Sequence, residues 1–121
     1  MARDEETPVV QSGTTLLKAI EEMSKKGLGI ITIADKKGEL LGILTDGDLR
    51  RTLEKRVDIY SVVVDEVMTK KPYTVKNDML AVDALLLYRN NSINSSPVVD
   101  HNNKIVGALT WQLIVKAGIV A

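Results

Sequence analysis

An internal repeat constrains the fold of this chain more than any other feature of its sequence. Residues 14–45 and residues 79–110 align without a gap at an offset of 65. Gly42 then pairs with Gly107 and Thr45 with Thr110, and the hydrophobic positions agree almost throughout. Such a repeat indicates two copies of one structural unit. Because a single unit of about 55–60 residues buries too little surface to be comfortably stable, the two copies are expected to share a core.

Each copy is expected to contain a short strand, a helix, two strands joined by a tight turn, and a closing helix. Apolar residues recur at helical spacing after Thr14 and after Asp78, both suitable N-caps, and Gly27 is a suitable helix stop. The turn-forming residues 35–38 and 100–103 each separate two β-rich runs, which is typical of hairpins. We expect strands at residues 9–10, 30–34, 40–44, 73–75, 97–99 and 104–109, and closing helices at about 46–56 and 111–117.

The sequence therefore predicts an α/β (α+β) fold, in which two βαββα repeats with pseudo-twofold symmetry form one compact module. We place the first repeat at residues 1–62 and the second at residues 63–121. The shared core has to be largely aliphatic, because aromatic residues make up only 3% of the chain.

Composition argues against several classes of function. The chain has 16 basic and 16 acidic residues, so no broad electrostatic attraction to nucleic acid or to an anionic membrane is expected. It has no cysteine, and its one histidine, His101, lies in a polar turn without ligand residues around it, so we expect no metal site. No apolar run approaches the roughly 20 residues that span a bilayer. A cytoplasmic location is the default expectation.

The segment from Gly42 to Leu49, GILTDGDL, is the sharpest local motif. A strand is expected to end at Thr45, and a helix follows with an acid, Asp48, at its third position. One interpretation is a capping box, in which the side chains of Thr45 and Asp48 bond each other's backbone amides. The same place also suits a ligand, because a helix N-terminus attracts phosphate and a carboxylate accepts hydrogen bonds from ribose hydroxyls. The two interpretations are compatible.

The repeat order and this motif resemble the cystathionine-β-synthase (CBS) domain. In that family the residues of such a motif contact the phosphate and ribose of a nucleotide, and two repeats form a disc with ligand clefts between them. The resemblance covers the whole chain and implies a ligand-sensing regulatory module without catalytic activity of its own. It also implies ligand contacts at Gly29, Ile31, Thr45, Asp48, Arg51, Thr74, Ser95, Ser96, Pro97 and Thr110.

A narrower resemblance is to the C-terminal half of D-arabinose 5-phosphate isomerases. It rests on GILTDGDLRR at residues 42–51, on Val67-Met68-Thr69 and on Lys116-Ala117-Gly118. The sugar isomerase domain of that family is absent here, so the resemblance implies the regulatory part of a longer enzyme. Because that family makes arabinose 5-phosphate for the lipopolysaccharide sugar Kdo, the resemblance implies CMP-Kdo as an effector, beside AMP or ATP. The sequence leaves the choice of ligand open.

The second repeat departs from the motif at Leu113, which stands where the aspartate is expected. Leucine cannot accept a hydrogen bond from ribose, so the second cleft is either empty or binds a ligand differently. Ser95 and Ser96 are either polar residues of a strand edge or ligand contacts. Arg50 and Arg51 belong to a basic cluster that is either a solvated face or placed to neutralise a phosphate, with Arg51 favoured.

Three classes of function compete. A regulatory module that binds a small ligand is favoured, and we expect it to require no cofactor. An independent enzyme is disfavoured, because the chain offers no nucleophile–base pair. A purely structural dimerisation module is the alternative.

The helix expected after Asp78 predicts a homodimer through the repeat helices. Leu85, Leu86, Leu87 and Tyr88 are consecutive, so this helix is apolar on more than one side and needs a partner on each. We expect Leu87→Asp to disrupt the dimer, and we expect Trp111, Ile114 and Val115 on the same surface.

Overall fold

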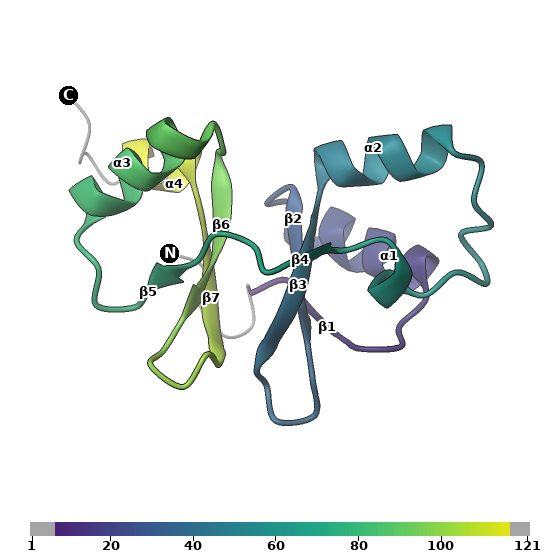
Figure 1. Cartoon of the computed structure of the whole chain (residues 1–121). Helices are drawn as coiled ribbons and strands as arrows, with labels where there is room; N and C mark the ends of the chain where they lie inside the picture. Colours follow the sequence, from purple (N-terminus) through teal and green to yellow (C-terminus); the bar gives the residue numbers. More distant parts are fainter. Residues whose placement is uncertain (1–6, 117–121) are drawn as a thin grey trace.

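The computed structural model describes residues 7–116, and in it two repeats stand beside each other (Figure 1). The first contains β1 (Val9–Gln11), α1 (Leu16–Lys26), β2 (Ile30–Ala34), β3 (Leu40–Thr45) and α2 (Asp46–Glu54). A connecting segment follows, with the 3-10 helix η2 (Val64–Glu66) and β4 (Thr69–Lys70). The second repeat contains β5 (Val75–Lys76), α3 (Ala81–Asn91), β6 (Ser95–Val99), β7 (Ile105–Thr110) and α4 (Trp111–Lys116). The expected βαββα order is confirmed in both repeats.

Each repeat builds its own mixed sheet. The strand orders are β1-β2-β3-β4 and β5-β6-β7, and in both sheets the first pair is parallel and the hairpin is antiparallel. The hairpins share one register, because Ile30 pairs with Thr45 and Ser95 pairs with Thr110, at the offset of 65 seen in the sequence. β4 lies beyond residue 62, where we expected the first repeat to end, yet it pairs with β3. The connecting segment is thereby held against the first repeat.

The helix ends agree with the sequence in part. Thr15, not Thr14, is the N-cap of α1, because its hydroxyl accepts a hydrogen bond from the third amide of the helix. α3 begins after Leu80, which has no capping side chain, because Asp78 lies two residues further back in the preceding turn. The stop at Gly27 is confirmed by its left-handed conformation, with φ 70°. None of the helices in residues 7–116 is long and apolar enough to cross a membrane.

The buried apolar side chains form three clusters, one of which joins the repeats. The first-repeat cluster contains Leu16, Ala19, Met23, Ile31, Ile33, Leu44 and Val64. The second-repeat cluster contains Val75, Ala84, Tyr88, Val98 and Ile114. The junction cluster contains Ile30, Leu40 and Ile43 of the first repeat with Val99 and Ala108 of the second. The repeats therefore share a core, as units of this size require.

Tyr88 is the largest fully buried side chain of the second-repeat cluster, with 1% of its surface exposed. Its hydroxyl lies 2.7 Å from the Ser96 hydroxyl and donates to the Leu109 carbonyl at 2.8 Å. Burial raises the pKa of this phenol to about 12, because the charged phenolate would lose its hydration. Tyr88 thus links α3 to both hairpin strands of its repeat.

Backbone hydrogen bonds join the turns of the two hairpins. The Leu40 amide donates to the Asn103 carbonyl at 2.9 Å, and the Ile105 amide donates to the Gly38 carbonyl at 3.0 Å. An isolated antiparallel bridge pairs Glu39 with residue 104 between these contacts. The repeats are therefore held together at the turn ends of β2, β3, β6 and β7. The opposite ends of the same strands are left to line a cavity.

The connecting segment is anchored to the first repeat through Asp65. Its carboxylate accepts hydrogen bonds from the Ser12 hydroxyl and from the Gly13 amide, the latter at 2.7 Å. These two bonds, that from Ser12 first, hold the pKa of Asp65 below its usual range. The neighbouring Val64 is fully buried, and its amide donates to the Thr14 carbonyl at 2.8 Å. These contacts position β4, which follows shortly after in the chain.

Candidate functional site

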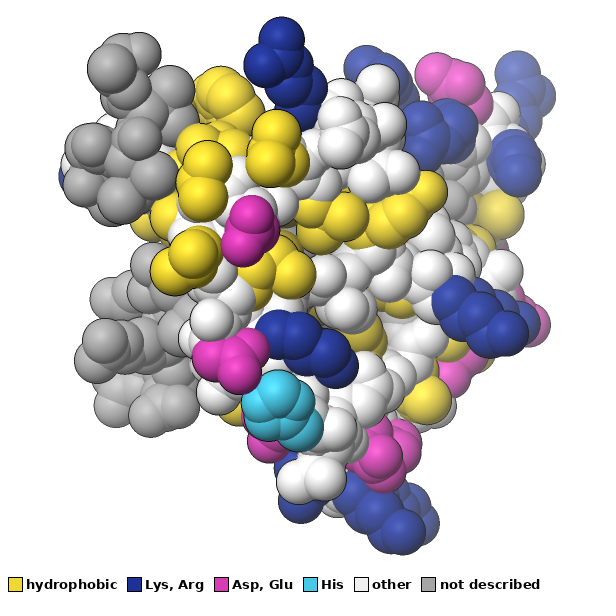
Figure 2. All heavy atoms as spheres, turned by 60° about the vertical axis from the view of Figure 1, so that its left-hand side comes forward, with side chains coloured by type: hydrophobic (Ala, Val, Ile, Leu, Met, Phe, Trp, Pro, Cys, Tyr) yellow, Lys and Arg dark blue, Asp and Glu magenta, His cyan; other side chains and the backbone are white. Residues whose placement is uncertain are grey.

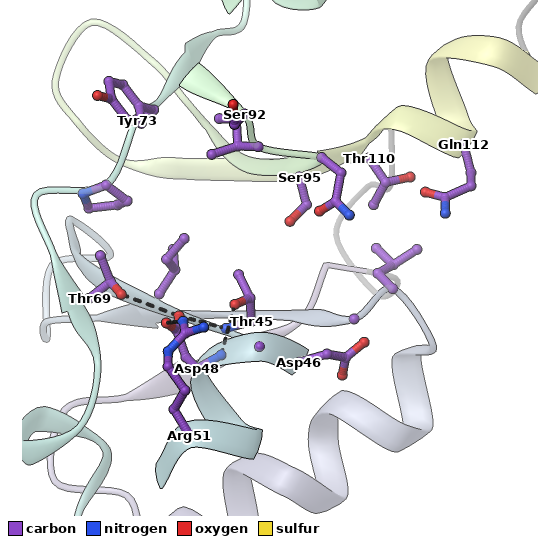
Figure 3. Close-up of a pocket in the computed structure, with 17 residues that line it drawn as sticks. Thr45, Asp46, Asp48, Arg51, Thr69, Tyr73, Ser92, Ser95, Thr110 and Gln112 are labelled. Atoms are coloured by element: carbon purple, nitrogen blue, oxygen red, sulfur yellow. Dashed lines mark hydrogen bonds and ion pairs between the residues drawn. The ribbon is translucent and has the colours of Figure 1, made fainter. Parts of the chain in front are cut away.

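A cavity of about 620 Å³ lies at the strand ends opposite the joined turns, and both repeats line it (Figure 3). The first repeat and the connecting segment contribute Leu28, Gly29, Ile43, Thr45, Asp46, Gly47, Asp48, Arg51, Thr69 and Pro72. The second repeat contributes Tyr73, Ser92, Ile93, Asn94, Ser95, Thr110 and Gln112. This volume is in the range of small-molecule binding sites.

Equivalent positions of the two repeats line this one cavity. Thr45 and Thr110 both contribute to the wall, as do Gly29 and Asn94, and each pair is related by the offset of 65. In Figure 3 the α2 side of the cavity carries Thr45, while the α4 side carries Thr110 and Gln112. The cavity between the repeats therefore has two unlike halves.

The first half is built on the N-terminus of α2. The Thr45 hydroxyl accepts a hydrogen bond from the Asp48 amide at 3.2 Å, and the Asp48 carboxylate accepts one from the Thr45 amide at 3.1 Å. The capping box predicted from the sequence is therefore confirmed. It orients the Asp48 carboxylate at the cavity wall, where 14% of the side chain remains exposed.

Two further side chains contact Asp48, and they come from different elements (Figure 3). The Arg51 guanidinium, one turn further along α2, donates to Oδ1 at 2.6 Å. The Thr69 hydroxyl of β4 donates to Oδ2 at 3.2 Å. Sequence reasoning missed Thr69 as a site residue, because it lies 21 positions from Asp48 and no periodic pattern links them. The carboxylate thus connects the site to the segment between the repeats.

Gly29 allows the backbone to pass close to the first turn of α2. Its φ is +73°, in the left-handed region that favours glycine, and its carbonyl accepts a hydrogen bond from the Asp46 amide at 3.1 Å. A Cβ at this position would lie 2.7 Å from a carboxylate oxygen of Asp46. A larger residue would therefore strain the backbone and displace an acid that lines the cavity.

The second half retains the helix cap but lacks the acid. The Thr110 hydroxyl accepts a hydrogen bond from the Leu113 amide at 3.1 Å, in the same way as Thr45 on α2. Leu113 itself is half-buried and offers no polar atom. Polar groups on this side come instead from Asn94, Ser95 and Gln112. This half can accept and donate hydrogen bonds, but it carries no carboxylate.

The structure brings together six of the ten residues that the resemblance implied as ligand contacts. Those lining the cavity are Gly29, Thr45, Asp48, Arg51, Ser95 and Thr110. Those outside its lining are Ile31, Thr74, Ser96 and Pro97. Strand geometry explains most of the second group, because successive side chains of a strand point to opposite faces of the sheet.

Ser96 follows Ser95 of the cavity wall, whereas Ile31 follows Ile30 of the junction cluster, and both Ile31 and Ser96 point into a core. Ile31 is fully buried in the first-repeat cluster. Ser96 is fully buried and bonds the Tyr88 hydroxyl, so its polar group is already satisfied. Pro97 is also fully buried, and Thr74 is half-buried next to β5. These four positions therefore do not form the cavity wall.

Sequence reasoning also missed two other cavity residues, Asn94 and Tyr73. Asn94 is the repeat equivalent of Gly29, so the offset of 65 identifies it directly. Tyr73 lies just before β5 with 53% of its surface exposed, and only the folded connecting segment shows that it reaches the cavity. Within residues 7–116, no group of three or more His, Asp or Glu side chains is arranged to hold a metal ion.

Comparison with known proteins identifies the repeats. The sequence matches the CBS domain family at residues 3–55 and again at residues 64–119. The chain belongs to the CBS-domain family. Its two βαββα units are the two members of a CBS pair, which is a regulatory, ligand-sensing module.

The relatives of this CBS pair include arabinose 5-phosphate isomerases. The chain is 42% identical over 113 residues to arabinose 5-phosphate isomerase KdsD of Pseudomonas aeruginosa, covering 93% of this chain and 35% of that protein. It is 35% identical over 120 residues to arabinose 5-phosphate isomerase GutQ of Escherichia coli, covering 99% of this chain and 37% of that protein. The chain therefore spans about a third of the length of the curated relatives it matches.

Solved CBS pairs share the fold along nearly the whole chain. CBSX2 from Arabidopsis thaliana superposes with a TM-score of 0.82 and 28% identity, covering 98% of this chain and 90% of that one. The structure of CBSX2 in complex with AMP superposes with a TM-score of 0.81 and 26% identity, covering 98% of this chain and 92% of that one.

Proposed function

We propose that this CBS pair binds a nucleotide or a nucleotide sugar in the cavity, and that it thereby modulates an attached arabinose 5-phosphate isomerase domain. The arrangement around α2 carries the first part of the proposal. Asp48 presents a carboxylate to the cavity beside a helix N-terminus and the Arg51 guanidinium. These groups match a ribose, which donates hydrogen bonds, and a phosphate, which accepts them. A cytoplasmic location belongs to the same proposal.

The relatives and the cavity rim support this choice of ligand. CBSX2 has been solved with AMP, and KdsD and GutQ are arabinose 5-phosphate isomerases. Tyr73 stands at the cavity with much of its ring exposed, and an exposed ring next to a polar site suits stacking against a base. The unlike second half, with Asn94 and Gln112, suits the uncharged part of a nucleotide sugar better than a second phosphate.

A thermal-shift panel tests the proposal directly. AMP, ATP, CMP and CMP-Kdo are added in turn at millimolar concentration, with glucose 6-phosphate as the control that has a phosphate but no nucleoside. A ligand present at a hundred times its Kd stabilises the fold by about 2.7 kcal/mol, so at least one nucleotide is expected to raise the Tm by several degrees. If none of the four exceeds the control, the cavity does not bind this class of ligand.

A homodimer is a second candidate role, and one surface favours it. Figure 2 shows hydrophobic side chains gathered on the face of the molecule formed by the second repeat. Its largest exposed apolar residues on α3, at the start of α3 and on α4 are Leu80, Val82, Leu86, Trp111 and Val115. Val82 and Leu86 are four residues apart and therefore lie on one side of α3. A second copy of the chain would remove these side chains from water.

Leu86→Asp is expected to convert such a dimer into a monomer, because the interface would have to bury an unpaired carboxylate. Leu86 is 48% exposed, whereas Leu87, the position we expected to face a partner, packs against the second-repeat cluster, and Ile114 is buried in it. Leu87→Asp would therefore damage the fold itself. Sedimentation at micromolar concentration measures the mass. The control is Leu53→Asp on α2, which should leave the dimer intact, and a wild-type chain of single-chain mass would contradict dimerisation.

A further inference from the structure

The Asp48 carboxylate has fewer open acceptor positions than a bound ribose would need. An ionised carboxylate offers about four lone-pair positions on its two oxygens. Here Oδ2 accepts hydrogen bonds from the Thr45 amide and the Thr69 hydroxyl, and Oδ1 accepts one from the Arg51 guanidinium. The two neighbouring hydroxyls of a ribose require two positions. One of the present donors therefore has to leave when both hydroxyls bind.

Arg51 is the donor that leaves most readily. The Thr45 amide belongs to the capping box of α2, and Thr69 is held by the pairing of β4 with β3. The Arg51 side chain is 60% exposed, and its ion pair with Asp48 spans a single turn of the helix. Ion pairs with one partner this exposed contribute little to stability, so breaking this one costs less than breaking either alternative.

The guanidinium already lies where a phosphate would bind. A Cβ built on Gly47 would stand 3.4 Å and 3.7 Å from two of its nitrogens, so the group covers the first turn of α2. A helix N-terminus repels a cation, and the Asp48 carboxylate is what holds this one there. A phosphate at the same N-terminus would offer the guanidinium a bidentate partner with only a small movement of the side chain.

We propose that Arg51 and Asp48 exchange partners when ligand binds. Arg51 moves from the carboxylate to the ligand phosphate, and the two ribose hydroxyls take the vacated position and the open one, both on Oδ1. This exchange rests on the proposed nucleotide-binding function, and it determines how the site distinguishes nucleotides from nucleosides. A nucleoside breaks the ion pair without offering Arg51 a new partner, whereas a nucleotide replaces both halves of the pair. The site therefore selects molecules that carry a ribose diol and a phosphate together.

Calorimetric titration of the full chain with AMP, adenosine, CMP and cytidine tests the exchange in the wild type and in Arg51→Gln. The variant is expected to bind the better of the two nucleotides about ten- to a hundredfold more weakly, because it loses a charge-assisted bond to phosphate. It is expected to bind the matching nucleoside about two- to fivefold more tightly, because Asp48 no longer has an ion pair to break. The matched control is Arg50→Gln, the neighbouring arginine outside the cavity lining, for which both affinities should stay unchanged.

The exchange requires the affinity of Arg51→Gln to fall for the nucleotide and to rise for the nucleoside. If Arg51→Gln binds the nucleotide more weakly and the nucleoside with unchanged affinity, Arg51 is a simple phosphate contact and the proposed exchange is wrong. If the variant binds both the nucleotide and the nucleoside more weakly, Arg51 only maintains the shape of the site, and the proposed exchange is again wrong. If the wild type binds none of the four probes while the thermal-shift panel is also negative, the proposed function fails and the exchange fails with it.

Discussion

Tyr88→Ala is expected to lower the free energy of unfolding by about 3–5 kcal/mol, the range for removing a large buried aromatic side chain. Tyr88 is 1% exposed and packs at the centre of the second-repeat cluster. Urea denaturation followed by circular dichroism measures the change. Tyr60→Ala is the matched control, because Tyr60 is 72% exposed, and its loss should change stability by no more than about 0.5 kcal/mol. Equal effects of the two substitutions would show that Tyr88 is not a core residue.

Tyr88→Phe removes the hydroxyl and keeps the ring, so it measures what the hydroxyl alone contributes to stability. It leaves the buried Ser96 hydroxyl and the Leu109 carbonyl without their partner, and a cost of about 1–3 kcal/mol is expected. The pKa of Tyr88 is raised from 10.0 to about 12, so the unfolded chain loses this proton at lower pH than the folded chain. Wild-type stability should therefore fall as the pH rises from 10 toward 12, and Tyr88→Phe should weaken that fall. An unchanged alkaline profile would contradict the burial of this hydroxyl.

Asp48→Ala is expected to weaken binding of the nucleotide identified in the panel by about 1–3 kcal/mol, which is roughly 5- to 150-fold. The variant removes the acceptor for the ribose hydroxyls and also releases Arg51 from the position where it meets the phosphate. Loss of the capping box should in addition lower the stability of the fold by about 1 kcal/mol. Affinity is therefore measured by calorimetry well below the Tm of the variant.

Thr15→Ala provides the matched control for Asp48→Ala. Thr15 caps α1 and does not line the cavity, so this variant should lose stability without losing affinity. If both variants bind nucleotide as tightly as the wild type, Asp48 acts as a helix cap and takes no part in the site.

The sequence predicted those features that depend on neighbouring residues or on the repeat itself. The capping box needs only Thr45 and Asp48, three positions apart, and the hairpins follow from turn residues between β-rich runs. The offset of 65 extended the same prediction to the second copy and reproduced the hairpin register. Helix starts were less accurate, because Thr14 and Thr15 are chemically alike and only the folded backbone shows which one bonds the helix.

The features that the sequence did not predict depend on contacts between distant parts of the chain. Thr69 reaches Asp48 only because β4 returns to pair with β3. It was also difficult to predict which side chains of each strand face the cavity, since a shift of one residue moves a side chain to the opposite face of the sheet. Ser95 lines the cavity, while Ser96, its neighbour, bonds Tyr88 in the core. Two adjacent serines carry no local signal that distinguishes these places.

The shared cavity has a consequence for how its two halves can differ. Two separate copies of one repeat, paired about a true twofold axis, would present every polar group of the cavity twice. Within a single chain the halves are encoded independently, so Asp48 stands in one half while its equivalent in the other is Leu113. Gly47 and Gln112 differ in the same way. Because the two repeats lie in one chain, the two ends of the cavity can carry different polar groups. Such a cavity favours one orientation of an asymmetric ligand.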